Sequence, residues 1–246
     1  MLKFLIITVL PVAFLLLYLY RQDKEKPEPK QKLAACFGLG MLGGAAGRFV
    51  KGIFSWLGIG SGYESVLYGD IICEAVVSAV FVSIVYLILW KHSEKNPDFD
   101  EFFDGPVYSV CIAFGYQFLC SLLTVFSDEW YYLGLLSIMT IVAIYAAGMV
   151  IGYYYSMARF GDMPLTRNNR IKMWAIPWAI VWTYNCFCDW SNQSAIGTTI
   201  AIVVFAILGY YIYKKNNAII DALKRKDITR PDSPSSDSST PPDNWQ

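Results

Sequence analysis

Histidine is almost absent from this chain, since His92 is the only one among 246 residues. The sequence also has no HExxH zinc pattern, no GxSxG serine motif and no CxxC pair, which excludes the common hydrolytic and structural zinc motifs. Cys186 and Cys188 are too close together for a usual zinc half-site. We therefore expect no metal site and no cofactor. A catalytic site would have to use carboxylates, amides, hydroxyls and thiols.

Charge is also scarce, at 16% of residues against about 25% in an average protein. Hydrophobic residues make up 55% of the chain, and they occur in long blocks separated by short polar loops, as in helices that cross a bilayer. We predict an all-α fold, a polytopic membrane helical bundle with about seven transmembrane spans within residues 1–213. The expected spans are 2–20, 33–56, 65–90, 105–126, 131–158, 171–190 and 195–213. A basic juxtamembrane segment, 214–230, and a disordered tail, 231–246, follow them.

Lysine and arginine are distributed unequally between the two sides of this predicted bundle. The segments after the first, third and fifth spans and the C-terminal tail carry most of them, whereas residues 127–130 and 191–194 carry none. Basic loops stay on the cytoplasmic side of a membrane. We therefore predict that the N-terminus is outside and the C-terminus inside.

The third span carries two carboxylates, Asp70 and Glu74, one helical turn apart. An acid near the centre of a bilayer costs about 2.5 kcal/mol or more, so it usually faces the interior of a bundle or a wet cavity. In the predicted orientation Glu74 lies about 6 Å deeper than Asp70. Gln117, Asn185 and Asp189 are expected to line the same outward-facing cavity. Asp70 and Asp189 have an alternative role as interfacial caps, which leaves Glu74 as the residue that most needs a polar partner.

Two further features of the spans bear on this site. The second span contains Gly40, Gly43, Gly44 and Gly47, and small residues at such spacing let helices approach closely, so we expect this span in the bundle interior. His92 is predicted in an inner loop, on the wrong side and at the wrong depth to meet Glu74.

Several segments follow one another in a fixed order along the chain. They are Asp23-Lys-Glu-Lys-Pro-Glu-Pro29, the glycine-rich second span, the glutamate of the third, Phe99-Asp-Glu-Phe-Phe-Asp-Gly-Pro-Val-Tyr108 with Ala113-Phe-Gly-Tyr116, Gly148-Met-Val-Ile-Gly-Tyr-Tyr-Tyr155 and Ile176-Pro-Trp-Ala179. This order resembles the PrsW family of intramembrane proteases, which are distant relatives of the prenyl-protein (CAAX-type) endopeptidases. The resemblance covers residues 15 to about 195.

The resemblance implies a catalytic Glu-Glu-x-x-Lys motif in the third span, an acid and an amide in the fourth, and histidines in later spans. Here Cys73 and Glu74 occupy the positions of the two glutamates, and Val77 occupies that of the lysine. The fourth-span segment 115–121 lacks the expected acid and amide. In the sixth span, Trp182 occupies the position of the expected histidine. Only Glu74 carries over as a catalytic residue. We therefore expect a non-catalytic or strongly divergent member that binds a membrane partner or substrate through the cavity. The alternatives are an active intramembrane protease that uses Glu74, and a small-molecule carrier or sensor.

The expected partners are membrane lipid and a membrane protein substrate or partner. The basic residues between Lys214 and Arg230 could contact anionic lipid, or they could be ordinary positive-inside flanking residues. Nucleic-acid binding is not expected, because the loops mix both charges and offer no aromatic-basic platform. The resemblance implies a bacterial cytoplasmic membrane as the location.

Overall fold

The structure is a computed structural model that describes residues 9–22, 28–59, 67–126, 135–161, 163–164, 166–191 and 195–229. Within these residues the chain is all-helical and contains no strand, so the predicted all-α class is confirmed. The helices are α2 (Leu10–Gln22), α3 (Lys30–Trp56), α4 (Leu67–Lys95), α5 (Asp104–Phe126), α6 (Leu135–Arg159), α7 (Arg167–Ser191) and α8 (Ala195–Thr229). The start of the first predicted span and the predicted disordered tail 231–246 lie outside the described residues.

Four helices of the described chain are long and apolar enough to cross a membrane. Their spanning stretches are Lys30–Trp56, Gly69–Glu94, Asp104–Leu123 and Thr140–Arg159. A bilayer core about 30 Å thick needs roughly 20 such residues in a helix. The composition of these helices indicates a membrane protein.

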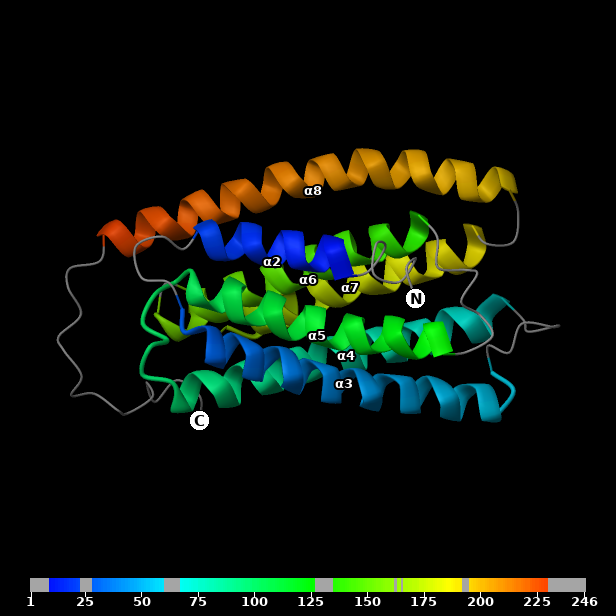
Figure 1. Ribbon diagram of the computed structural model, residues 1–246, viewed down its shortest axis with the longest axis horizontal. Helices are drawn as coiled ribbons and strands as arrows, with labels where there is room; N and C mark the ends of the chain where they lie inside the picture. The colour runs from blue at the N-terminus through cyan, green and yellow to red at the C-terminus, as the bar shows by residue number, and fades with distance from the viewer. Residues whose placement is uncertain are drawn as a thin grey trace.

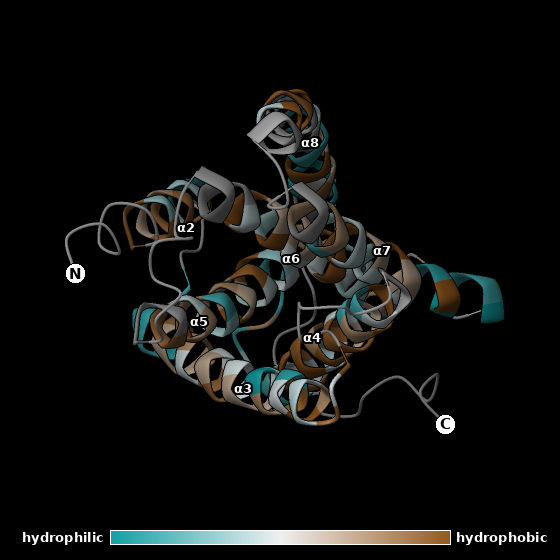
Figure 2. Ribbon diagram, turned by 90° about the vertical axis from the view of Figure 1, so that its right-hand side faces the viewer, coloured by the Kyte–Doolittle hydropathy of each residue, from teal (hydrophilic) through white to brown (hydrophobic). Residues whose placement is uncertain are grey.

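The helices lie side by side along the long axis of the molecule (Figure 1). Seen end on, α3, α4, α7, α6 and α5 follow one another around a ring in which each helix contacts the next (Figure 2). α2 packs against α5 and α6 outside this ring, and α8 packs against α6 and α7. The ring therefore brings α3, α4 and α7 together, and these three helices carry the candidate site.

Helix α5 is enclosed by its neighbours over most of its length, since every residue from Phe102 to Tyr116 is buried. Glycines of α3 allow this close packing. A Cβ atom at Gly40 would lie 2.1 Å from the carbonyl oxygen of Ile112, and one at Gly44 would lie 2.5 Å from that of Tyr116. The glycines of the second predicted span therefore face the bundle interior, as their spacing predicted.

Helix α7 contains Pro177 in its interior, and the neighbouring helix compensates for it. Proline has no backbone N–H, so the carbonyl oxygen of Met173, four residues earlier, loses its partner within the helix. The Tyr86 hydroxyl of α4 donates a hydrogen bond to this oxygen at 2.6 Å. This hydrogen bond, made where Pro177 interrupts the backbone bonding of α7, joins α7 to α4.

The structure extends one predicted span and corrects the position of one residue. The basic segment after residue 213 is a direct continuation of α8, which ends at Thr229. Ile220 and Leu223 of this continuation are buried, and burying an apolar face stabilises a helix beyond its intrinsic propensity. His92 lies in the last turns of α4 and not in a loop. α4 ends just before Asn96, where Pro97 disfavours a further helical residue.

Candidate functional site

Glu74 lies inside the helix ring and is held by residues from two other helices. Its residue is only 4% exposed. Lys51 of α3 donates to Oε1 of Glu74 at 2.6 Å, and Asn185 of α7 donates to Oε2 at 2.8 Å. The side chain of Lys51 is 46% exposed, whereas that of Glu74 is 6% exposed. We call these three residues the Glu74 site. The acid of its ion pair is buried, and the side chain of the lysine is half-exposed.

Three tryptophans of α7 position Asn185 against α4. Trp174, Trp178 and Trp182 follow at four-residue spacing and stack with ring centres 5.9 and 4.8 Å apart, each pair with planes 15° apart. Trp178 Nε1 donates to the carbonyl oxygen of Ala75 at 2.9 Å, and Trp182 Nε1 donates to that of Ile71 at 3.1 Å. We call these three residues the tryptophan ladder. It fixes α7 on the turn of α4 that carries Glu74.

Trp182 stands where the family resemblance expects a histidine. Its ring stacks on Trp178, and its N–H bonds to the backbone of α4. An indole nitrogen is a donor only and cannot accept a proton or bind a metal. Trp182 therefore joins two helices and has no capacity for the chemistry of an imidazole.

The other residues predicted to line the cavity have different surroundings. Gln117 donates to the Ser121 hydroxyl, one turn along its own helix, at 3.1 Å. Asp70 is half-buried, one turn before Glu74 on α4. Asp189 belongs to α7, but its side chain lies outside the part of the chain whose side chains are described. The structure thus brings Asn185 to Glu74 and leaves the shared cavity a prediction.

Lys51 is the partner of Glu74 that the sequence analysis did not identify. It lies near the end of the second predicted span, where lysines commonly extend outward to the membrane surface. The available signal was the opposite charge of Glu74, which lies near the same end of the next span. An intramembrane acid usually pairs with another charged group, so a lysine at matching depth was a candidate partner.

Two buried hydroxyl groups lie beside the Glu74 site. Ser78 is one helical turn from Glu74 on α4, and the Tyr116 hydroxyl lies directly over Gly47, one turn before Lys51 on α3. Neither hydroxyl has a hydrogen-bond partner among the described residues. A buried hydroxyl without a partner costs about 1–3 kcal/mol, so each of these two groups would be stabilised by a hydrogen bond to a polar ligand or to water.

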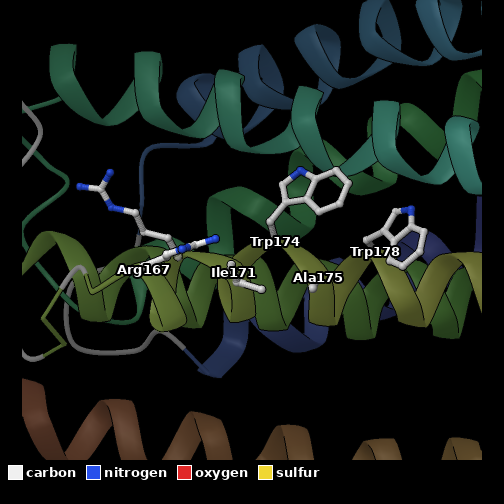
Figure 3. A pocket seen from close by; sticks show the side chains of 6 residues that line it. Arg167, Ile171, Trp174, Ala175 and Trp178 are labelled. Atoms are coloured by element: carbon white, nitrogen blue, oxygen red, sulfur yellow. The ribbon is translucent and has the colours of Figure 1, made fainter.

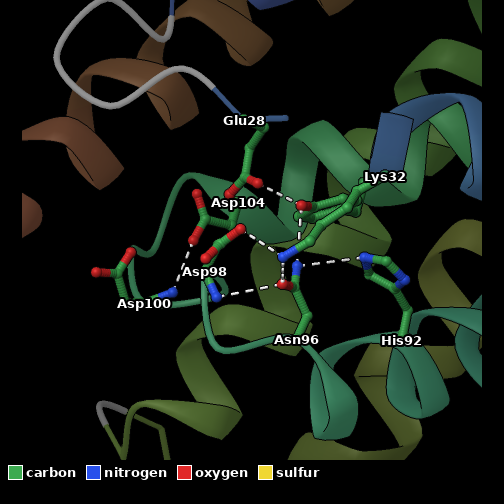
Figure 4. A network of polar contacts seen from close by, with 8 residues as sticks. Glu28, Lys32, His92, Asn96, Asp98, Asp100 and Asp104 are labelled. Atoms are coloured by element: carbon green, nitrogen blue, oxygen red, sulfur yellow. Dashed lines mark hydrogen bonds and ion pairs between the residues drawn. The ribbon is translucent and has the colours of Figure 1, made fainter. Parts of the chain in front are cut away.

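A second polar cluster closes the other end of the ring (Figure 4). The Tyr108 hydroxyl donates to buried Glu28 and accepts a hydrogen bond from Asn96 Nδ2 at 2.9 Å. Lys32 donates to Asn96 and forms an ion pair with Asp98. We call this cluster the Glu28 network; its members are Glu28, Lys32, His92, Asn96, Asp98, Asp104 and Tyr108.

The Glu28 network joins the ends of three helices. One carboxylate oxygen of Asp104 accepts hydrogen bonds from the backbone N–H groups of Asp100 at 3.0 Å and Glu101 at 2.8 Å, which holds the loop before α5. The His92 ring packs on the Tyr108 ring with centres 4.5 Å apart. His92 is about 27 Å from Glu74 along α4. The histidine therefore belongs to this network and is far from the Glu74 site.

The comparisons with known proteins add no family assignment. No protein-family model, curated protein or solved structure matches the chain significantly. In the part of the chain that the structure describes, no three His, Cys, Asp or Glu residues are grouped so that they could hold a metal ion. The functional proposal therefore depends on the geometry of the Glu74 site.

Proposed function

We propose that this chain is a PrsW-like multi-pass membrane protein that does not cleave peptides and that uses the Glu74 site to bind a polar group of a membrane-embedded partner or substrate. The observation that carries the proposal is the identity of the two residues that hold Glu74. A protonated lysine and the NH₂ group of an asparagine are donors only. Neither replaces the second carboxylate or the imidazole of the expected catalytic set, and neither group, with no lone pair to offer, can bind a metal ion.

The same geometry supports binding. Lys51 is half-exposed while Glu74 is buried, so the ammonium group is within reach of a molecule beside the bundle. The Ser78 and Tyr116 hydroxyls lie deeper, next to the site. A ligand with carbonyl or carboxylate oxygens could accept a hydrogen bond from the half-exposed Lys51 and, deeper in the bundle, from the hydroxyls of Ser78 and Tyr116. Hydrogen bonds to charged groups are the stronger kind, at about 1.5–3 kcal/mol.

We further propose that all seven helices cross the membrane, with the N-terminus outside, so that the Glu74 site opens on the outer side. Basic side chains support this orientation, because they gather at the other end of the ring. They include Lys32, Lys91, Arg159, Arg167 and Arg170. The Arg159 guanidinium donates to the backbone of Ser93 at 3.2 Å, which places the ends of α4 and α6 together there. The positive-inside rule assigns this end to the cytoplasm.

An activity assay tests the first part of the proposal. The purified full chain is reconstituted in vesicles with membrane-tethered peptides, and products are identified by mass spectrometry. We expect no cleavage above that of empty vesicles, and the same result for Glu74→Gln. Cleavage by the parental chain that disappears in Glu74→Gln would overturn the non-catalytic assignment and establish a divergent protease.

Chemical labelling tests the position of the site. Cysteine is introduced at Lys51 or, as the matched control, at exposed Lys172 of α7, and intact cells are treated with a membrane-impermeant maleimide. We expect Lys51→Cys to react from outside and Lys172→Cys to react only after the cells are opened. The parental chain measures the background of its six native cysteines. The reverse pattern would refute the orientation.

A further inference from the structure

One face of the first half of α7 is hollowed. A hollow of about 870 Å³ is lined by Arg167, Arg170, Ile171, Trp174, Ala175 and Trp178. Figure 3 shows Arg167 at one end of this face, with Trp174 and Trp178 farther along it. A second hollow of about 480 Å³ adjoins the first, because Trp174 and Trp178 also line it together with apolar residues of α4. We call the combined surface the α7 groove.

The α7 groove is cationic at one end and apolar along the rest. Arg167 and Arg170 are exposed and three residues apart, so they are neighbours on the helix surface. Ile171 is 54% exposed and Trp174 is 38% exposed. Neither arginine has an ion-pair partner within the described part of the chain. Both stand in the first turn of α7, where the helix dipole disfavours cations, so helix stability does not account for them.

The contacts between α7 and α4 set the depth of the two arginines. The two helices are antiparallel, and Trp174 Nε1 lies 3.4 Å from the Ser83 hydroxyl. Arg167, seven residues before Trp174, is therefore level with about Trp90 of α4. The candidate membrane span of α4 ends at Glu94. The guanidinium groups thus lie near the level of lipid phosphates, and the tryptophans lie toward the hydrocarbon.

From this arrangement we infer that the α7 groove is a binding site for an anionic phospholipid, whose phosphate contacts Arg167 and Arg170 and whose acyl chain lies along Trp174 and Trp178. Guanidinium groups bind phosphate with paired hydrogen bonds. About 12 Å separates Arg170 from Trp178 along α7, which is well within the length of an acyl chain. The apolar surface of a partner's transmembrane helix would cover the tryptophans but would offer no anion to the two arginines at the phosphate level.

Native mass spectrometry of the full-length chain in mild detergent tests this inference. The protein is mixed with equal amounts of phosphatidylglycerol and phosphatidylcholine, and the ratio of the two bound lipids is measured. The test variant is Arg167→Gln with Arg170→Gln. The matched control is Lys214→Gln with Lys215→Gln, which removes two exposed charges from α8 outside the groove. A Trp178→Leu variant tests the apolar part, and melting temperatures verify that each variant is folded.

We expect the parental chain to prefer phosphatidylglycerol. This preference should fall about thirtyfold in the arginine variant, because each of the two basic residues contributes about 1 kcal/mol to the binding of an anionic lipid, which is slightly more than fivefold. The lysine control should keep the parental preference, because Lys214 and Lys215 do not line the α7 groove, although they belong to the basic segment that could contact anionic lipid. Trp178→Leu should retain less lipid in total while keeping the preference. Arg167→Lys with Arg170→Lys should keep most of the preference for phosphatidylglycerol. This variant shows whether the glutamine variant loses the preference through its missing charges or through a change in the fold.

Three results would overturn the inference. One is equal retention of phosphatidylcholine by the parental chain. Another is displacement of the lipid by inorganic phosphate or glycerol phosphate, because these would show that a soluble anion suffices. The third is crosslinking of α7 to a second copy of the chain in bilayers, which would show that the α7 groove is an interface between protomers.

Discussion

Removing Lys51 should destabilise the protein more than removing the charge of Glu74, although the two residues form one ion pair. In Lys51→Met the Glu74 carboxylate stays buried and keeps only the hydrogen bond from Asn185. In Glu74→Gln the remaining cation is half-exposed, so water can solvate it. The asymmetry follows from which partner is accessible.

The structure sets the size of the effect. Leaving one partner of a fully buried pair uncompensated costs about 3–5 kcal/mol. Because Lys51 is 46% exposed, the pair is partly screened, and we expect about 2 kcal/mol for Lys51→Met. For Glu74→Gln we expect about 1 kcal/mol or less, since the new amide oxygen can still accept from Asn185. The double variant should be close to Glu74→Gln alone, which gives a coupling of about 2 kcal/mol, equal to the cost of Lys51→Met.

The free energy of unfolding is measured by titrating the purified protein from dodecyl maltoside into SDS, with helicity followed by circular dichroism. Lys172→Met, which removes an exposed lysine of α7, is the control and should change stability by less than about 0.5 kcal/mol. Hydrogen bonds between membrane helices average about 0.6 kcal/mol in double-mutant cycles, so the expected coupling is distinguishable from an ordinary contact. An equal cost of Lys51→Met in the presence and absence of the Glu74 charge would refute the reasoning.

Two further predictions concern helix packing. Gly40→Ala should lower the free energy of unfolding by about 1–3 kcal/mol, because the new Cβ would meet the Ile112 carbonyl. Gly38→Ala is the control and should be neutral or stabilising, because nothing lies within 4 Å of a Cβ there. Equal effects of the two substitutions in the same SDS titration would contradict the close contact. Tyr86→Phe should lower the free energy of unfolding by about 1–2 kcal/mol, because it leaves the Met173 carbonyl without its donor. In a Pro177→Ala background the same substitution should cost much less, because alanine restores the backbone N–H. A cost that persists in that background would show that the Tyr86 hydrogen bond does not compensate for the proline.

Four helices of the described chain could be predicted from the sequence because each contains a long apolar block. A block of about 20 apolar residues identifies a membrane helix without reference to any other part of the chain. The glycines of α3 were equally informative, since their spacing marks one helix face and Gly40 and Gly44 do lie against α5. Helix ends were harder to predict. α8 continues past residue 213 because Ile220 and Leu223 find an apolar surface, and such a surface exists only after the bundle has formed.

Side-chain pairing was the part that the sequence could not provide. Glu74 was identified as a buried acid from its position alone, but its partners come from helices that lie 23 and 111 residues away in the sequence. Depth in the membrane narrows the candidates, yet the ring order of α3, α4 and α7 decides which side chains meet. The Glu28 network was missed for the same reason, since Glu28 and Tyr108 are 80 residues apart.

The segments that produced the family resemblance prove to be packing elements. Glu28 from the proline-rich segment before α3 accepts the hydrogen bond of Tyr108 from the segment at the start of α5. Gly152 lies so close to the second segment that a Cβ atom there would be 2.3 Å from the nitrogen of Pro106. These residues hold helix ends together, which is a packing role. The position at which the resemblance expects a histidine is Trp182, which bonds to the backbone of α4. The segments that carry the resemblance thus say how the helices pack, and the proposal of binding in place of hydrolysis depends on the partners of Glu74, which are Lys51 and Asn185.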